Sequence, residues 1–532
     1  MPLTDMIHPK ESGEEGKDDG RLTQYKNLTK HEELRRRRTE CSVEIRKQKG
    51  ADMMMKRRNI VAVDDDEDEE NTESELEEQK SAPSRLSHDD IKSVLSNNPS
   101  EEDMLKCFQS LRKSLSKSKN PPINEVISSG LLHALVQALG VQNAHVQYEA
   151  SWALTNIVSG TTEQTVAAVE AGATQPLINL AVNGTDQNSE QALWAVANIA
   201  GDSAQLRDYV VKCNGVEALM ILIDRMPNLE DSHVRTIAWA FSNMCRHKNP
   251  HAPLEMLRVL SKGLEKLVQH PDRQVRQDAC WAVSYLTDGP DRQIELARES
   301  GILPHIISFL KESENLVAPA LRTLGNVATG TDSLTQAVID LGALEQILPL
   351  MEKTRSSSIV KECCWLLSNI IAGTQKQIQA VIDARLLPVI VSVLKSGDHK
   401  CQFEASWALS NLAQGGTHRQ IVAMMDENAV PALCATLNQT NTSMLTNTLE
   451  TLYTLMLTVQ NHFPIKLDIL RDQVEEVGGL DALERLQESQ SETIYSQAYR
   501  IVSQFFSDDD GVETDVDPSD AENRPANAAW QF

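Results

Sequence analysis

The sequence has few aromatic residues and no long apolar run. Aromatic residues make up 4% of the 532 residues, whereas hydrophobic residues make up 41%. A core built from such a sequence must use Leu, Ile, Val and Ala, which suits packed helices better than a β-sandwich. No apolar stretch approaches the roughly 18 residues of a membrane helix, so we expect no membrane insertion. The polar N-terminus (MPLTDMIHPKESGEEGK) also lacks the apolar region of a secretion signal.

The sequence also lacks the motifs of catalysis and metal binding. It contains nine cysteines but no CxxC pair, and its 13 histidines are scattered. No GxGxxG, no GxxxxGK[ST] and no HExxH occurs. We therefore expect neither an enzyme nor a metal or cofactor site, and we interpret the cysteines as small buried residues in a reducing compartment.

Charge is distributed very unevenly along the chain. The net charge is −25, yet residues 21–58 carry 13 Lys and Arg against 5 Asp and Glu. Residues 64–78 carry 11 acids and residues 508–522 carry 8, both without a base. An acidic body argues against direct nucleic-acid binding and favours basic partners, including the chain's own arm. We predict a disordered segment (1–20), a basic arm (21–63), an acidic linker (64–88), a helical domain (89–506) and a disordered acidic tail (507–532).

An internal repeat organises the helical domain. The segments EASWALTNI (149–157) and EASWALSNL (404–412) are nearly identical, and intermediate copies lie between them. Aligned on one position, the copies fall at Trp152, Trp194, Trp239, Trp281, Arg322, Trp365 and Trp407, in steps of 41 to 45 residues. A helical period of 40–47 residues is typical of armadillo and HEAT repeats. We predict an all-α solenoid of about ten armadillo repeats, in which a Gly precedes one helix of most repeats to allow a sharp turn.

An amide follows most of these tryptophans at a fixed spacing. Four residues after the aligned position come Asn156, Asn198, Asn243, Tyr285, Asn326, Asn369 and Asn411. Residues i and i+4 share one helix face, so stacked repeats align a row of indoles beside a row of amides. One interpretation is structural, with Trp in the core and Asn as a cap. The other is a peptide-binding surface, because an Asn amide can bond both the N–H and the C=O of an extended main chain.

Acidic residues beside the indoles indicate the charge of the ligand. Slots between indoles suit the aliphatic stems and cationic tips of Lys or Arg. Asp202, Asp278, Asp288 and Glu404 are placed to favour those cations. A scaffold for acidic partners is the alternative, but it calls for a basic groove. For the basic arm, the alternative is a generic nucleic-acid or membrane tail.

The sequence resembles the importin α (karyopherin α) family of nuclear import adaptors. The resemblance rests on the Trp-x-x-x-Asn array, on segments such as WALTNIVSGTTEQT and NVATGTDSLTQAVIDLGAL, and on the arm RRRRTECSVEIRKQKGADMMMKRRN. It runs from about residue 20 to residue 506. It implies a right-handed superhelical solenoid that binds mono- and bipartite nuclear localisation signals of cargo proteins and links them to importin β.

The resemblance also implies two cargo sites. The major site comprises Trp152, Asn156, Gly160, Thr165, Gln191, Trp194, Asn198, Asp202, Trp239, Asn243 and Asp278. The minor site comprises Arg322, Asn326, Thr335, Trp365, Asn369, Glu404, Trp407 and Asn411. Gly160, Thr165 and Asp202 would enclose the principal Lys of the signal. The steps at Tyr285 and Arg322 would separate the sites, with Arg322 repelling cations.

The arm would bind importin β and also compete with cargo. The implied residues are Arg35, Arg36, Arg37, Arg38, Arg46, Lys47, Lys49, Lys56, Arg57 and Arg58. Lys56 to Arg58 read as a localisation signal that would occupy the major site when importin β is absent. An export receptor would bind near residues 430–506, and the protein would shuttle between cytoplasm and nucleus. Two departures from the family pattern, Thr236 and Ala328, bear on cargo preference.

Overall fold

The computed structural model describes residues 56–59, 86–246 and 249–507. In these residues the regular structure is helical, without a β-strand. Contacts divide the chain after Gln420 into two compact units. The arm residues Arg35 to Lys49, the acidic linker up to residue 85 and the tail from residue 508 lie outside the described residues.

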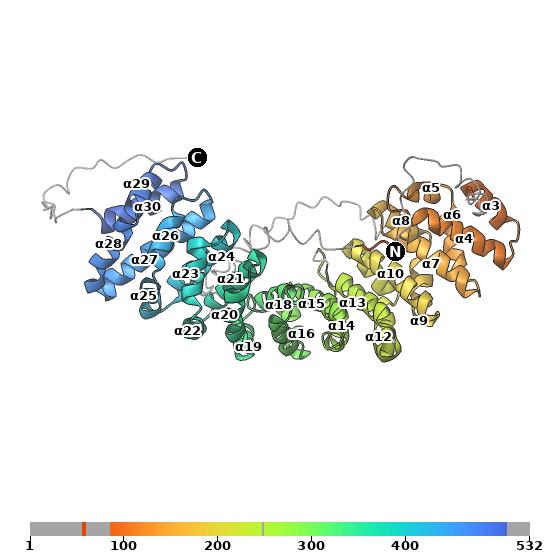
Figure 1. Cartoon of the computed structure of the whole chain (residues 1–532), viewed down its shortest axis with the longest axis horizontal. Coiled ribbons are helices and arrows are strands. Elements are labelled where there is room, and N and C mark those ends of the chain that lie inside the picture. Colours follow the sequence, from red (N-terminus) through yellow and green to blue (C-terminus); the bar gives the residue numbers. More distant parts are fainter. Residues whose placement is uncertain (1–55, 60–85, 247–248, 508–532) are drawn as a thin grey trace, which may run out of the picture. The chain divides into compact units, whose positions relative to one another are not determined.

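The first unit repeats a pattern of short helices followed by a longer one (Figure 1). Its helices are α3 (His88–Ser96), α4 (Glu101–Leu115), α5 (Ile123–Ser128), α6 (Leu131–Ala138), α7 (Ala144–Val158), α8 (Thr162–Glu170), α9 (Thr174–Asn183), α10 (Asp186–Asp202), α11 (Ala204–Lys212), α12 (Gly215–Arg225), η2 (Met226–Asn228), α13 (Asp231–Arg246), α14 (Leu254–Leu267), α15 (Arg273–Leu286), α16 (Asp291–Glu299), α17 (Leu303–Ser308), η3 (Phe309–Lys311), α18 (Glu314–Val327), α19 (Asp332–Asp340), α20 (Ala343–Lys353), α21 (Ser357–Ile371), α22 (Gln375–Asp383), α23 (Leu387–Ser396) and α24 (His399–Gly415). The boundary between the units falls within α25 (His418–Asp426).

The second unit continues the pattern. Its helices are α26 (Ala429–Thr436), α27 (Thr442–His462), η4 (Pro464–Lys466), α28 (Leu467–Glu476), α29 (Gly479–Leu486) and α30 (Glu492–Phe505). Here α27 packs against α30, and Leu452, Leu455 and Ile501 are buried.

Polar caps fix where the repeats begin. Thr161, Thr331 and Thr374 are the N-caps of α8, α19 and α22, and each hydroxyl accepts from a backbone N–H three residues on. Such caps satisfy N–H groups that have no partner within the helix. The turn that ends α7 and starts α8 is thereby held in place, and this turn carries Gly160.

Positive φ angles mark the sharp turns predicted before the apolar helices. Gly130, Gly172, Gly301 and Gly342 have φ between 75° and 87°. In the turn before α12 the left-handed residue is Asn214 (φ 64°), and Gly215 instead begins α12. Asn adopts this conformation more readily than other residues with a Cβ, so the turn survives the shift by one position.

Packing between consecutive long helices builds the solenoid. In the first unit α4, α7, α10, α13, α15, α18, α21 and α24 pack in succession. Their buried faces consist mainly of Leu, Ile, Val and Ala, as the low aromatic content predicts. The eight cysteines among the described residues are buried free thiols. The predicted all-α solenoid is confirmed.

No single helix in the described residues is both long and apolar enough to cross a membrane. The bent pair α22–α23 passes that test when its helices are joined, with an angle of 79° between them. Both helices bury apolar side chains in the first unit, among them Ile378, Val381, Ile390 and Leu394.

Candidate functional site

The asparagines of the repeated pattern join neighbouring long helices. The Nδ2 atoms of Asn198, Asn243, Asn326, Asn369 and Asn411 donate to backbone carbonyls of the preceding long helix, at 2.9 to 3.3 Å. Each of these side chains is at least 97% buried. The structural interpretation of the amides is therefore correct in part, because one hydrogen of each amide fastens two repeats together. Asn326 Nδ2 also donates to Thr287 Oγ1 at 3.4 Å. An amide has a second hydrogen and an acceptor oxygen besides the bond that fastens the repeats.

The amides and indoles form two groups, which we name by their residues. The first half of the ladder runs from Trp152 to Asn243 on α7, α10 and α13. The second half runs from Arg322 to Asn411 on α18, α21 and α24. Trp194 and Trp239 meet edge to face with ring centroids 6.3 Å apart. Between the halves, Trp281 stacks on Tyr285 at 6.2 Å.

Residues 56–59 of the chain lie along the first half. Asn198 accepts from the Arg57 N–H at 2.8 Å and donates to the Arg57 carbonyl at 2.9 Å. Asn156 bonds both main-chain groups of Asn59 in the same way, at 3.0 and 3.1 Å. The indole N–H groups of Trp194 and Trp152 donate to the same two carbonyls, at 2.8 and 3.0 Å. The segment thus advances two residues per repeat and runs opposite to the order of the repeats.

A polar pocket holds the Lys56 ammonium group. Its Nζ donates to the Gly160 carbonyl at 2.9 Å and to Thr165 Oγ1 at 2.8 Å, and it forms an ion pair with Asp202. The Thr165 hydroxyl itself donates to backbone oxygens, so its lone pairs face the cation. The Lys56 and Asp202 side chains are 12% and 2% exposed, so water screens this pair little.

Arg57 and Arg58 bind in different ways. The Arg57 guanidinium lies 4.6 Å from the Trp239 ring centroid, and its Nη2 is 3.2 Å from Asp278 Oδ2. Burial raises the pKa of Asp278, and the charge of Arg57 opposes that rise. Arg58 donates to the carbonyls of Leu115, at 2.7 Å, and Lys117. Carbonyls at a helix C-terminus have no partner within the helix and carry partial negative charge, so they suit a cation.

The remaining predicted residues of the first half are also close to the segment or to each other. Gln191 Oε1 accepts from the Asn59 amide at 2.9 Å. The Thr236 hydroxyl donates to Ser232 O of its own helix at 3.2 Å. Thr236 has no amide and makes no hydrogen bond to residues 56–59, unlike Gln191, which holds the same position before Trp194.

The second half has the same backbone-bonded threonine as the first half but lacks an acid in the place of Asp202. The Thr335 hydroxyl donates to the carbonyls of Ala328 and Thr331, both at 3.3 Å, as Thr165 does to Val158 and Thr161. Gly373, however, stands four residues after Asn369, where Asp202 follows Asn198. Ala328 and Glu404 are buried.

Arg322 is paired within the chain. Its Nε and Nη2 donate to the two carboxylate oxygens of Glu362 at 2.9 and 2.7 Å. Lys361 Nζ lies 2.9 Å from the same carboxylate. Glu362 was not among the predicted residues. It lies three residues before Trp365, as Glu404 lies before Trp407, so the spacing that points to Glu404 could have found it.

Other contributors were also missed. The carbonyls that bind Arg58 carry no side-chain signal in the sequence. Arg246, the last residue of α13, has a buried Nη2 without a hydrogen-bond partner among the described residues. Burial lowers its pKa. Its charge and that of Arg322 oppose the rise that burial causes in the pKa of Tyr285. Asp288, a predicted cation contact, follows Thr287, the C-cap of α15.

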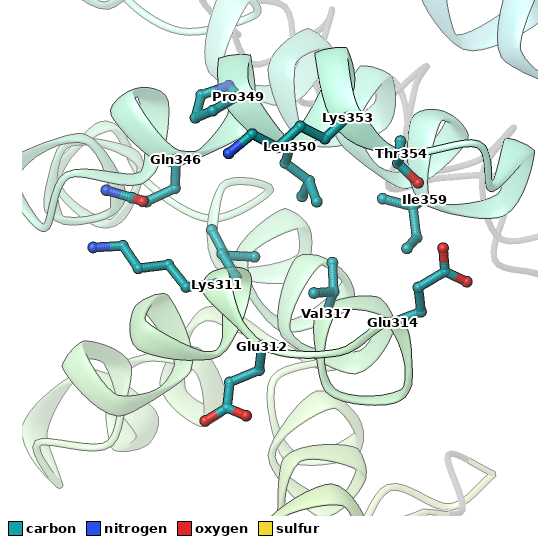
Figure 2. A pocket seen from close by; sticks show the side chains of 11 residues that line it. Lys311, Glu312, Glu314, Val317, Gln346, Pro349, Leu350, Lys353, Thr354 and Ile359 are labelled. Carbon is teal, nitrogen blue, oxygen red and sulfur yellow. The ribbon is translucent and has the colours of Figure 1, made fainter.

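A separate hollow of about 440 Å³ lies between η3, α18 and α20 (Figure 2). Lys311, Glu312, Glu314 and Lys353 stand around it, and Val317 and Leu350 line it. It includes no residue of the indole and amide rows. Among the described residues no His, Cys, Asp and Glu cluster could hold a metal ion.

Comparisons with known proteins agree with this architecture. An importin beta binding domain profile matches residues 21–109. Armadillo/beta-catenin-like repeat profiles match residues 119–159, 161–201, 203–246, 290–329, 331–372 and 374–414, and an atypical Arm repeat matches residues 469–519. The crystal structure of an engineered protein superposes with a TM-score of 0.69 at 24% identity, over 79% of this chain and 100% of that one, which supports the fold alone.

The curated relatives are import proteins. Importin subunit alpha-2 of Caenorhabditis elegans is 76% identical over 527 residues, covering 98% of each chain. Importin subunit alpha-3 of Arabidopsis thaliana is 36% identical over 353 residues, covering 66% of this chain and 65% of that one.

The fold and the repeat profiles define an armadillo-repeat protein. The relationship over nearly the full length places the chain in the importin α family, as the sequence resemblance predicted. It is a nuclear import adaptor with an importin-β-binding domain and a cargo-binding repeat array, and the family is not one of enzymes.

Proposed function

We propose that the first half of the ladder binds the basic localisation signals of cargo and that Lys56 to Arg58 compete for it. The observation that carries this proposal is the Lys56 pocket. A cation there meets a carbonyl, a hydroxyl and a carboxylate, and the adjacent main chain is held by two amides. An amide–main-chain contact does not depend on the ligand's side chain, so the site would select a cation at one position and accept an extended chain elsewhere.

The second half serves as the minor site for the other basic cluster of a bipartite signal. Support comes from Trp407 Nε1 and Asn411 Oδ1, buried polar atoms without a hydrogen-bond partner among the described residues. A buried donor or acceptor without a partner costs about 1–3 kcal/mol, so a main chain that pairs with both would bind favourably.

Competition by the arm makes the adaptor autoinhibited. Because the segment is part of the same chain, its strength follows from its effective concentration at the groove rather than from affinity alone. Importin β would remove the arm by binding residues 21–63, including the cluster Arg35 to Arg38. Cargo and importin β would therefore bind cooperatively, and the protein would shuttle between cytoplasm and nucleus with its cargo.

The second unit offers a surface for the export receptor. Ile465, Ile469, Val477, Tyr495 and Tyr499 are exposed there, and the Ile465 side chain is 92% exposed. Large exposed apolar side chains are typical of interaction surfaces. Changing Ile465 and Ile469 to Asp should abolish capture of the export receptor and leave importin β binding intact.

The test of autoinhibition is peptide binding to the full chain with and without importin β. A fluorescent basic localisation peptide should bind the Lys56→Ala chain roughly tenfold or more tightly than wild type without importin β. With importin β the two chains should bind it equally. Lys92→Ala, which removes one exposed charge from α3, is the control and should change nothing. Equal affinities of Lys56→Ala and wild type without importin β would reject autoinhibition by this segment.

A further inference from the structure

Arg112 occupies the ladder position of the first described repeat. It lies on α4, forty residues before Trp152, and Ser116 lies forty residues before Asn156. An arginine and a serine therefore stand where the following repeats carry Trp and Asn. The side chains of α4 thus end the ladder.

Both groups at this end are already engaged within the chain. Arg112 Nε and Nη2 donate to Glu149 at 2.7 and 3.3 Å, and its guanidinium lies 4.5 Å from the Trp152 ring centroid. The Arg112 and Glu149 side chains are 13% and 9% exposed. Ser116 donates to the Arg112 carbonyl at 2.9 Å and accepts from Asn156 at 3.0 Å. The Glu149 carboxylate, one face of the Trp152 indole and the Ser116 hydroxyl therefore each have a partner within the chain.

The same pair recurs at the start of the second half. Arg322 also replaces a Trp, and it too binds both oxygens of a glutamate, Glu362. In each pair the glutamate lies three residues before the Trp of the next repeat: Glu149 before Trp152, and Glu362 before Trp365. This recurrence indicates a common arrangement rather than a single accident of packing.

The bound register brings a ligand to this pair. Arg57 meets Asn198 and Asn59 meets Asn156, so a bound chain advances two residues per repeat. Alternate side chains of an extended chain point the same way. On a bound peptide, the side chain two residues after the one in the place of Asn59 therefore reaches Arg112 and Glu149.

We infer that the Arg112–Glu149 pair is a specificity-determining stop that ends cation recognition after Trp152. This inference rests on the proposed peptide site. Arg112 fills the face of Trp152 that would stack on a ligand cation, and it neutralises the carboxylate that would attract one. A Lys or Arg at that ligand position gains no contact, whereas the preceding slot between Trp152 and Trp194 accepts one.

Peptides derived from the chain itself test the stop without altering the protein. The probe is a fluorescein-labelled peptide of residues 54–63 (MMKRRNIVAV), made unaltered and with N59K, V61K or A62K. The full chain is used, since its own segment competes equally with every peptide. N59K should bind roughly three- to tenfold more tightly than the unaltered peptide. V61K should bind no more tightly than A62K, which carries the same charge. A several-fold preference for V61K over A62K would overturn the inference.

Replacing Arg112 should allow a ligand cation to bind beside Trp152 and Glu149. In the Arg112→Ala chain, V61K should bind roughly three- to tenfold more tightly than A62K, because Glu149 and the Trp152 face become available. The gain should vanish in the Arg112→Ala, Glu149→Gln chain. No gain in an Arg112→Ala chain that melts at the wild-type temperature would also overturn the inference. If Arg112→Ala does not fold, the wild-type comparison decides alone.

The proposed peptide site fails separately. With importin β present to remove the chain's own segment, it is wrong if the unaltered peptide does not bind wild type, or if it binds an Asp202→Lys chain equally well. A different result rejects the stop and keeps the peptide site. In that case the unaltered peptide binds wild type and not the Asp202→Lys chain, but the V61K peptide binds wild type more tightly than the A62K peptide.

Discussion

The two halves of the ladder share a frame and differ in where their acids lie. Both have Trp-x-x-x-Asn pairs whose amides fasten neighbouring helices. In both, a threonine near the start of a short helix (Thr165 in α8, Thr335 in α19) donates its hydroxyl to the backbone. Lys56 and Arg57 contact Asp202 of the first half and Asp278 of α15. Both halves have acids three residues before a Trp: Glu149 in the first, and Glu362 and Glu404 in the second. The second half lacks only the acid of the Lys56 pocket, because Gly373 stands in the place of Asp202.

The difference teaches how one backbone frame can serve two ligand segments. The amides hold main chain in either half, so the shared frame sets affinity for extended chain in general. The carboxylates decide which ligand position must be a cation. We therefore expect the first half to depend on one deeply buried Lys contact, and the second half to rely on contacts beside the indoles.

The largest effect should come from reversing the charge at Asp202. Asp202→Lys places a second ammonium in the Lys56 pocket, and breaking a buried ion pair costs about 3–5 kcal/mol. Binding of a single-cluster basic peptide to the full chain, with importin β present, should fall at least about 100-fold by fluorescence anisotropy.

Glu217→Lys makes the same charge change on the exposed face of α12 and is the matched control. It should alter the affinity less than about threefold. A comparable loss in both variants would mean that overall charge, not the pocket, governs binding.

Acid should destabilise the first half selectively through His233. This side chain is 1% exposed, and burial lowers its pKa to about 4. In the unfolded chain this histidine takes up a proton at about pH 6.5. The contribution of neutral His233 to the free energy of unfolding is therefore complete above that pH and is lost as the pH falls toward 4. The loss should approach about 3 kcal/mol in urea unfolding.

His233→Phe should flatten this pH dependence. The positions equivalent to His233 in the second half are Ile359 and Cys401, six residues before Trp365 and Trp407. Neither side chain takes up a proton between pH 6.5 and pH 4, so the loss of stability from this position in acid is confined to the first half. An unchanged slope in His233→Phe would show that other groups cause the acid sensitivity.

Removing Arg322 should destabilise the second half. Glu362, whose side chain is 5% exposed, would lose the guanidinium that binds both its carboxylate oxygens and would keep Lys361 among its partners. The free energy of unfolding should fall by about 2 kcal/mol in urea titration. Arg322→Leu combined with Glu362→Leu should recover most of that loss, since it leaves no unpaired buried charge. An Arg322→Ala chain as stable as wild type would mean that the other partners of Glu362, Lys361 among them, suffice.

The smallest effect should come from adding an amide to the first half. Thr236→Asn supplies a side chain three residues before Trp239 that can reach a bound main chain, worth about 0.5–1.5 kcal/mol. A basic peptide should bind about two- to tenfold more tightly by anisotropy. Thr236→Val removes a hydroxyl that bonds Ser232 of its own helix and Glu190 of α10, and it should leave affinity unchanged. Weaker binding in Thr236→Asn would contradict the account of this position.

The fold and most of the site follow from patterns that repeat. Trp152 and Asn156 stand four residues apart and recur every 41 to 45 residues, which determines both the solenoid and the shared face. The Lys56 pocket could be predicted only from the resemblance to the importin α family, because Gly160, Thr165 and Asp202 do not recur at a common spacing in the sequence.

What escaped prediction lacks a local pattern. Arg112 and Glu149 are 37 residues apart, and the pair exists only once α4 and α7 pack together. The carbonyls that receive Arg58 belong to the main chain, so no side chain marks them. The dual role of the amides, as fasteners and as ligands, depends on how closely neighbouring helices approach, which spacing in sequence does not reveal.

The chain's own Lys56 to Asn59 segment occupies the first half of the ladder. Fluorine NMR of the full chain with 5-fluorotryptophan tests it most directly, with each resonance assigned by Trp→Phe substitution. The combined Lys56→Ala and Arg57→Ala change should shift the Trp152, Trp194 and Trp239 signals and leave Trp407 in place. Unchanged first-half signals, or a shift confined to Trp365 and Trp407, would contradict the account.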